Sequence, residues 1–228
     1  MSVLTPEALA PEKLVAAAHA FGLWTGWGLL HSLLAARRVK AACQRVLGPR
    51  PYALYPLGYT LVSLWTFYVV FKMEPDLPQL LWAVQGPLAW AMYGLQLAGL
   101  ALLVWAGVSM QAFKMFGLPQ LASLLRGRAP DEADAPDLHK DFSSSGAYAL
   151  VRHPMHLGGM LFLALQPRLS LGGFVFALFG CLYMLLGSLL EERRLALALG
   201  PVWADYVRRV PMFLPWPRPR TIGNRPER

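Results

Sequence analysis

The chain has 228 residues, of which 56% are hydrophobic and only 15% are charged, with a formal net charge of +8. Soluble domains carry about a quarter of charged residues, so this composition and a mean hydropathy of +0.40 exclude an ordinary soluble domain. They predict one integral membrane domain, residues 1–228, embedded in a lipid bilayer. Basic residues cluster at the ends of apolar segments, an arrangement that argues against a nucleic-acid partner.

The acidic N-terminal segment lacks the basic region of a signal peptide, so we expect the first apolar segment to be retained. Apolar segments of about 20 residues, enough to cross a bilayer, occupy residues 14–36, 52–71 and 88–110. The polar residues 126–145 predict a mobile loop, either a plain linker or a lid over a ligand.

Residues 154–190 predict a helical hairpin whose first arm is too short to cross a bilayer, because Pro167 and Arg168 interrupt it before the full-length arm 171–190. Residues 191–228 follow as a helical tail. The predicted fold is therefore all-α, with about five transmembrane helices and the last two paired.

The distribution of basic residues predicts the orientation. Eighteen of the 21 lysines and arginines lie after the first or third span or in the tail, and only Lys13, Lys72 and Arg168 lie on the other side. The positive-inside rule then places the N-terminus outside and the C-terminus in the cytoplasm.

The segment YALVRHPMHLGG, which begins at Tyr148, carries the first polar cluster. A residue before proline is extended, so His153 should precede the helix that Pro154 begins. His156 would lie in the first turn, where free N–H groups favour an anion. Gly158 permits close approach of a ligand or of another helix. This cluster, with Arg152, is either a functional pocket or an interfacial helix cap with snorkelling side chains.

The second polar cluster, Glu191-Glu192-Arg193-Arg194, ends the hairpin. With Leu169 at the tip, Glu191 lies ~33 Å and His153 ~30 Å away along the two arms. The two clusters should therefore meet near the cytoplasmic interface. Neighbouring helical residues point about 100° apart, so we expect one glutamate to face the pocket and the other to pair with Arg194 or solvent. The alternative is a solvated charge run.

The remaining histidines and the cysteines give less information about function. His31 is more typical of an interfacial residue than of a ligand, and it lies ~18 Å along the helix from His19, too far for both to bind one iron. Cys43 and Cys181 are expected to be free thiols, and no metal site is expected. Tyr206 belongs either to an interfacial aromatic belt or to the wall of the site.

The motifs VRHPMHLGG, LLEERRLALALG and WADYVRRVPMFLP resemble those of the membrane methyltransferases that include isoprenylcysteine carboxyl methyltransferase and phospholipid methyltransferases. LLHSLLAARRVK and KMFGLPQL extend the likeness towards bacterial methanethiol S-methyltransferases and NnrU-type proteins. The resemblance implies a bacterial inner-membrane enzyme that binds S-adenosylmethionine on the cytoplasmic side.

The residues that match the family's motif positions are Arg152, His153, Pro154, Gly158, Glu191, Glu192 and Tyr206. The predicted cofactor-binding residues are the last six of these together with Arg194. We expect one glutamate to bind the cofactor's amine or ribose, and Arg152 or Arg194 to bind its carboxylate. His156 stands where the family usually has tyrosine, and it could serve as a base. Arg152, His153 and His156 are thus the predicted catalytic residues.

The expected reaction is in-line attack of a small thiol, or another small or lipophilic acceptor, on the cofactor's methyl group. Two alternatives stay open at this point. One is an NnrU-like haem protein or isomerase that uses His19, His31, His153 and His156, and the other is a membrane scaffold without enzymatic activity.

Overall fold

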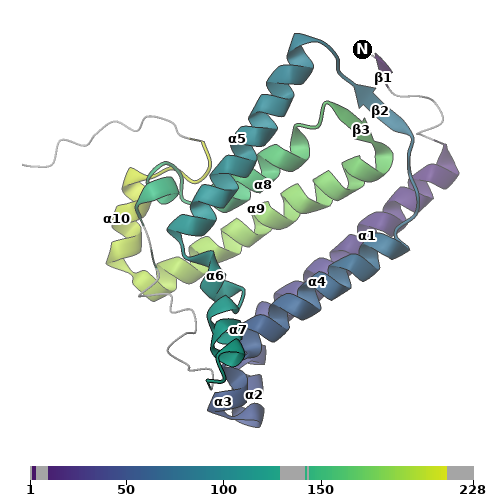
Figure 1. The fold of residues 1–228 in the computed structure, drawn as a ribbon. Helices are drawn as coiled ribbons and strands as arrows, with labels where there is room; N and C mark the ends of the chain where they lie inside the picture. Colours follow the sequence, from purple (N-terminus) through teal and green to yellow (C-terminus); the bar gives the residue numbers. More distant parts are fainter. Residues whose placement is uncertain (1, 4–9, 129–141, 143, 215–228) are drawn as a thin grey trace, which may run out of the picture.

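The structure is a computed structural model that describes residues 2–3, 10–128, 142 and 144–214. Helices dominate it, and two groups of them lie side by side (Figure 1). Helix α1 (Pro11–Ala35) packs against α4 (Tyr55–Met73) and against α9 (Leu171–Leu199), while α8 (Pro154–Ala164) packs against α9 and α5 (Pro87–Ser109). The shorter helices are α2 (Arg37–Leu47), α3 (Pro49–Tyr52), α6 (Ala112–Met115), α7 (Leu118–Leu125), α10 (Pro201–Arg209) and the 3-10 turn η3 (Gly146–Ala149).

Prolines begin several of these helices. Pro11, Pro87, Pro154 and Pro201 each occupy the first helical position, where the missing N–H is not needed and the fixed φ suits the helix. His153, with φ −123° and ψ 60°, precedes α8 in a non-helical conformation. The expectation that His153 lies before the helix is therefore confirmed.

A small antiparallel sheet adds to the expected all-α architecture. Its strands are β1 (Ser2–Val3), β2 (Leu80–Ala83) and β3 (Arg168–Ser170), in the order β1-β2-β3. Strand β3 occupies the tip of the hairpin, because Pro167 cannot continue α8, and Ser170 then caps α9 by accepting a hydrogen bond from the N–H of Gly173 (3.1 Å). The sheet thus closes the hairpin end opposite the polar clusters.

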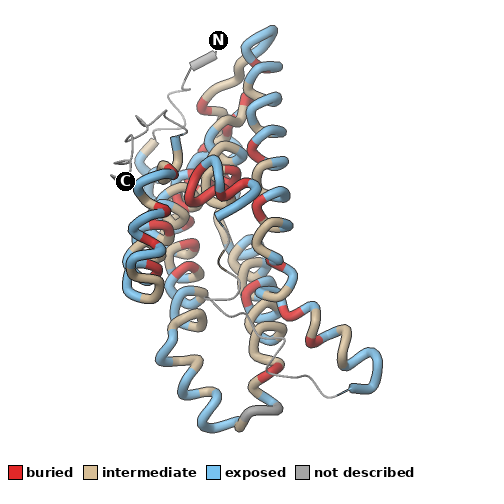
Figure 2. The backbone as a smooth tube through the Cα atoms, turned by 90° about the vertical axis from the view of Figure 1, so that its left-hand side faces the viewer, coloured by how far each residue is buried: buried red, intermediate tan, exposed pale blue. Residues whose placement is uncertain are grey.

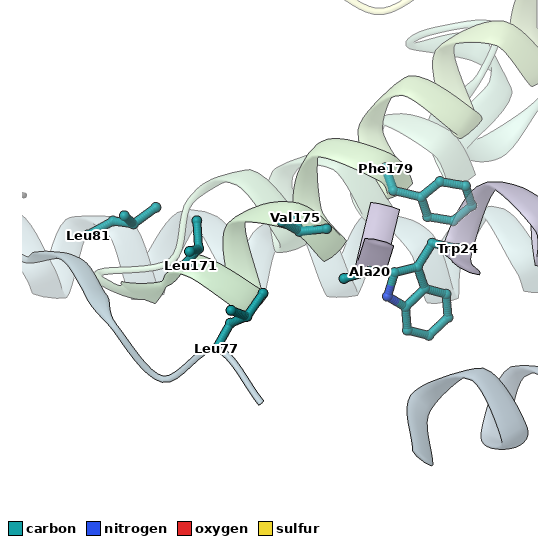
Figure 3. Close-up of a cluster of buried hydrophobic side chains, with 7 residues drawn as sticks. All are labelled: Ala20, Trp24, Leu77, Leu81, Leu171, Val175 and Phe179. Carbon is teal, nitrogen blue, oxygen red and sulfur yellow. The ribbon is translucent and has the colours of Figure 1, made fainter. Parts of the chain in front are cut away.

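A hydrophobic core joins α1 to α9 near the sheet (Figure 3). Trp24 is almost fully buried, and its ring lies 4.8 Å from that of Phe176 and 4.9 Å from that of Phe67. The indole N–H donates to Glu74 at 2.8 Å, so the polar edge of this buried ring is satisfied. The other buried members are Ala20, Leu77, Leu81, Leu171, Val175 and Phe179.

Helices α5 and α8 cross closely at two glycines. A Cβ atom placed on Gly99 would lie 2.8 Å from the carbonyl oxygen of Gly158, and one on Gly158 would lie 2.8 Å from the backbone nitrogen of Leu103. Such close backbone approach is typical of helix pairs that have small residues at the crossing. This crossing fixes α8, and with it the preceding RHP segment (residues 152–154), against α5.

Many residues on the outer surface of the helices are exposed (Figure 2), and a large number of these are apolar. Along α5, Trp90 is 75% exposed, Leu97 67% and Val108 72%, which is more than the isolated apolar residues of a soluble surface. Helices α5 and α9 are both long and apolar enough to cross a membrane, and α8 is a shorter apolar helix. These apolar surfaces suggest membrane association.

The predicted spans 14–36, 52–71, 88–110 and 171–190 coincide within a few residues with α1, α4, α5 and the first two thirds of α9. Among the described helices, only α5 and α9 meet both the length and the hydropathy criterion, so five crossings stay a prediction. Most of the predicted loop 126–145, and the tail beyond residue 214, lie outside the described residues.

Candidate active site

A cavity of about 850 Å³ opens between the polar end of the hairpin and the α2–α4 region. Its wall includes residues of α2, α4, α5, η3, α8, α9 and α10, which are distant in sequence and brought together by the helix packing. Predicted site residues on this wall are Arg152, His153, His156, Glu191, Arg194 and Tyr206. The volume is within the usual range for small-molecule sites.

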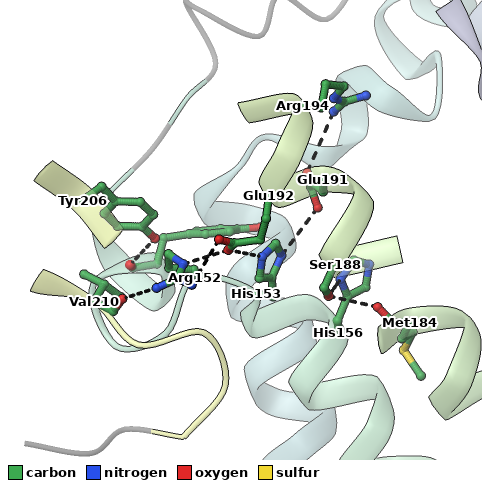
Figure 4. A network of polar contacts seen from close by, with 11 residues as sticks. Arg152, His153, His156, Met184, Ser188, Glu191, Glu192, Arg194, Tyr206 and Val210 are labelled. Carbon is green, nitrogen blue, oxygen red and sulfur yellow. Dashed lines mark hydrogen bonds and ion pairs between the residues drawn. The ribbon is translucent and has the colours of Figure 1, made fainter. Parts of the chain in front are cut away.

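Arg152, His153 and Glu192 form a largely buried hydrogen-bond network that includes the Arg152–Glu192 ion pair (Figure 4). The Nε and Nη2 atoms of Arg152 donate to the two carboxylate oxygens of Glu192 at 2.8 and 3.1 Å, and Nη1 donates to the carbonyl of Val210 at 2.7 Å. The His153 Nε2 atom lies 2.8 Å from Glu192 Oε1. Bidentate pairing of this kind fixes the geometry of both partners. Glu192, on the second arm of the hairpin, therefore holds Arg152 in place just before the first arm begins.

The C-terminal helix is fastened to the same network. Tyr206 is 1% exposed and donates its hydroxyl to the carbonyl oxygen of Tyr148 at 2.7 Å, while the N–H of Arg152 donates to Pro211 at 2.8 Å. Burial raises the pKa of both tyrosine hydroxyls, which keeps them protonated donors. The structure therefore places Tyr206 in the cavity wall.

His156 presents one ring nitrogen to the cavity side. Its Nδ1 atom lies 2.7 Å from the hydroxyl of Ser188, and that hydroxyl donates its proton to the carbonyl of Met184 at 2.9 Å. The hydroxyl must then accept a hydrogen bond from His156. The neutral imidazole therefore carries its proton on Nδ1, and its Nε2 atom has a lone pair. Ser188 is fully buried and was missed from sequence, because its role depends on the facing of α8 and α9.

The two glutamates differ from the expected division of roles. Glu191 lines the cavity, lies 3.5 Å from His153 Nδ1, and also pairs with Arg194 at 3.9 Å. Glu192 points to Arg152 and His153 and is absent from the cavity wall as described. The expectation that Arg194 would pair with the glutamate facing away from the pocket is wrong, because residues 191 and 194 share one helix face.

Basic side chains form a cationic rim on the cavity wall. Arg37 and Lys40 of α2 line the wall together with Arg194 of α9. Burial and the neighbouring Arg194 lower the pKa of Lys40, because an uncompensated positive charge is disfavoured there, and an anion bound between the two side chains would relieve that cost. Lys40 was not predicted as a site residue from the sequence, although it lies within the segment LLHSLLAARRVK.

Besides Glu192, two other predicted cofactor contacts, Pro154 and Gly158, do not lie on the described cavity wall. Pro154 is fully buried at the start of α8, and Gly158 packs against Gly99 and Leu103 of α5. Of the two roles that a glycine permits, close approach of another helix is the one the structure shows at Gly158. Both residues position the site and do not touch the cavity.

The other histidines lie apart from this cluster. His31 is hydrogen-bonded through Nδ1 to Ser63 (3.0 Å) and through Nε2 to Tyr59 (2.6 Å), and it stacks on Trp27. His19 is exposed on α1. Since both ring nitrogens of His31 have side-chain partners, the arrangement gives no support to the haem interpretation.

Comparison with known proteins gives consistent relatives. The chain is 29% identical over 189 residues to methanethiol S-methyltransferase 2 of Bradyrhizobium diazoefficiens, covering 83% of this chain and 69% of that protein. It is 32% identical to methanethiol S-methyltransferase 1 of the same organism, covering 82% and 63%. It is 29% identical to methanethiol S-methyltransferase of Mycobacterium tuberculosis, covering 84% and 75%. The chain thus spans about two thirds to three quarters of their lengths.

No family model and no solved structure matches the chain. The relatives and the joined RHP and Glu-Glu clusters nevertheless indicate its class: the chain is a methyltransferase, and it resembles the isoprenylcysteine carboxyl methyltransferase-like family. Its relatives within that family are methanethiol S-methyltransferases. The resemblance found in the sequence motifs is therefore confirmed.

Proposed function

We propose that this chain is an S-adenosylmethionine-dependent membrane methyltransferase that methylates a small thiol at the cytoplasmic interface. The observation that carries the proposal is the His156 imidazole, hydrogen-bonded through Nδ1 to Ser188 on the wall of a cavity that also has a cationic rim. The names of the relatives supply the acceptor class, since they are methanethiol S-methyltransferases.

The cavity wall fits a zwitterionic methyl donor. Lys40 and Arg194 offer positive charge for its carboxylate, and Glu191 offers negative charge for its ammonium group. Aromatic side chains of Tyr148, Tyr206 and other wall residues offer flat surfaces for its base. When bound, the donor would supply an electrophilic methyl group on a sulfonium centre. Arg152 has three donors occupied by Glu192 and Val210, so Arg194 is the better carboxylate partner.

His156 would remove the proton of the acceptor thiol. A thiolate is the nucleophilic form of sulfur, and an unprotonated imidazole nitrogen is suited to accept its proton near neutral pH. Ser188 fixes the ring by accepting the Nδ1 proton, so Nε2 stays available as the basic nitrogen of a side chain on the cavity wall. The remaining contribution of the protein is to hold donor and acceptor in line, which is proximity and orientation.

The position of the cavity supports an interfacial site. It lies at the end of the hairpin opposite the small sheet, beside the basic helix α2. The positive-inside rule assigns such basic segments to the cytoplasm, where S-adenosylmethionine is produced. A small apolar thiol could reach this site from the bilayer or from water.

The test is incubation of the purified chain with methyl-labelled S-adenosylmethionine and a panel of one thiol, one amine and one carboxylate. We expect label transfer to the thiol and a rate at least ~10²-fold lower for His156→Gln. Transfer to the amine or carboxylate alone would reassign the acceptor, and no transfer to any member would contradict the proposed function.

A further inference from the structure

Three potential metal ligands gather on one side of the cavity. One ring nitrogen each of His153 and His156 and one carboxylate oxygen of Glu191 lie within 4.8 Å of one another (Figure 4). They come from the end of the RHP segment, the first turn of α8 and the last third of α9. His153 is buried and the other two are half-buried. No metal site was expected from the sequence, because these residues are not spaced as a ligand motif.

The hydrogen bonds of the two histidines leave suitable nitrogens for an ion. His156 gives its Nδ1 proton to Ser188 and so keeps a lone pair on Nε2. His153 directs Nε2 at the carboxylate of Glu192 (2.8 Å), which places its proton there and turns Nδ1 towards Glu191. A histidine that ligates a metal usually donates its other N–H to a carboxylate or another acceptor. Both histidines have this outer partner already in place.

The short distance between His153 Nδ1 and the Glu191 carboxylate also favours a cation at this place. The two atoms are 3.5 Å apart, and when the histidine is neutral both are electron-pair donors. A cation between them would convert this repulsion into two bonds. Ligand atoms around a tetrahedral zinc ion are ~3.4 Å apart, given bonds of about 2.0–2.1 Å, so a pair at the 4.8 Å limit would need to approach by ~1.4 Å.

We propose that His153, His156 and Glu191 bind one divalent transition-metal ion of the zinc type on the cavity wall. Two imidazoles and one carboxylate suit zinc and its neighbours in the first transition series, and they do not suit magnesium or calcium, which prefer oxygen ligands. With three protein ligands, the ion keeps at least one position open to the cavity.

The ion would compete with the methyl donor, a consequence that rests on the proposed function. Glu191 is the carboxylate of the described wall near the histidines, and it cannot at once ligate the ion and pair with the donor's ammonium group. Occupancy by zinc therefore blocks donor binding, and a high concentration of the donor displaces zinc.

The experiment measures zinc binding to the full chain, purified in detergent and treated with a chelator, without donor or thiol. Isothermal titration with zinc chloride should give one site per chain. His156→Gln and Glu191→Gln should abolish that site, and Ser188→Ala, which removes only the outer partner of His156, should weaken it about 10- to 100-fold. His19→Gln is the matched control, because His19 is exposed on α1, and it should bind as the unmodified chain does.

Cobalt chloride provides a second measurement on the unmodified chain alone, and it does not depend on whether the variants fold. The visible absorption of bound Co²⁺ should appear with one equivalent and disappear when zinc is added. Absence of both signals in the unmodified chain, or equal zinc binding by all four variants, would overturn the proposal. Methyl transfer is measured separately, so a chain that transfers label but binds no zinc refutes the metal site and leaves the proposed function intact.

Discussion

At the scale of single residues, neighbouring carboxylates serve different partners. Glu192 holds the buried guanidinium of Arg152, whose side chain is 7% exposed, whereas Glu191 lines the cavity. The 100° rotation between successive helical residues separates the two directions. The sequence indicates that the roles differ, but it does not indicate which glutamate takes which role.

Glu192→Gln should therefore destabilise the chain. The buried Arg152 would lose its counter-charge, at a cost of roughly 2–3 kcal/mol. Thermal unfolding in detergent measures this, with Glu191→Gln as the matched control that keeps near-normal stability and loses affinity for S-adenosylmethionine. Equal stability of Glu192→Gln and the unmodified chain would show that the ion pair is not structural.

Lys40→Met should weaken donor binding without changing the chemical step. Loss of a charge-assisted contact to the donor's carboxylate predicts a KM about tenfold higher at similar kcat, equivalent to ~1.4 kcal/mol. The control is Arg38→Met, which changes an exposed basic residue of the same helix that is not on the described cavity wall. A similar KM for both variants would remove Lys40 from the donor site.

At the scale of elements, the site depends on how helices cross. The RHP segment is placed by α8, and α8 is placed against α5 by the contact of Gly99 with Gly158. The hairpin returns α9 to the same depth, so the expected meeting of the two polar clusters is confirmed by the 2.8 Å contact of His153 with Glu192. Helix α10 then holds the chain just before the RHP segment, because Tyr206 donates a hydrogen bond to the carbonyl of Tyr148.

Gly158→Ala should disturb this crossing. The added methyl group would collide with the backbone of α5 near Gly99 and Leu103, and backbone cannot move aside as a side chain can. We expect a lower melting temperature together with lower activity. Gly94→Ala, on α5 with nothing within 4 Å of its added Cβ, is the control and should be neutral or slightly stabilising; matching behaviour of the two variants would contradict the packing role.

At the scale of the whole molecule, the exterior of the long helices is apolar and the end that holds the cavity is polar. Exposed leucines, valines and tryptophans cover α5, while the basic residues of α2 and the cavity rim gather at one end. This arrangement supports an orientation with α2, α10 and the cavity in the cytoplasm.

The two cysteines, both free, can test that orientation. Cys43 lies in the basic helix α2, and Cys181 lies within the apolar part of α9. A membrane-impermeant maleimide should label Cys43 in inside-out vesicles and not in intact cells, and Cys181→Ser should leave that labelling unchanged. Labelling of Cys43 from outside intact cells would reverse the orientation.

The sequence by itself determined the helical class, the extents of the long apolar helices, the break at Pro167 and the family, because these depend on local composition, helix-starting prolines and short motifs. It also indicated that the RHP and Glu-Glu clusters meet, since helix rise converts residue counts into depth. Only the tertiary structure decided that Glu191 faces the cavity, that Ser188 assigns the proton of His156, that Lys40 joins the rim, and that Gly158 serves helix packing. These features depend on how helices are rotated and crossed, and packing between segments distant in the chain sets that rotation.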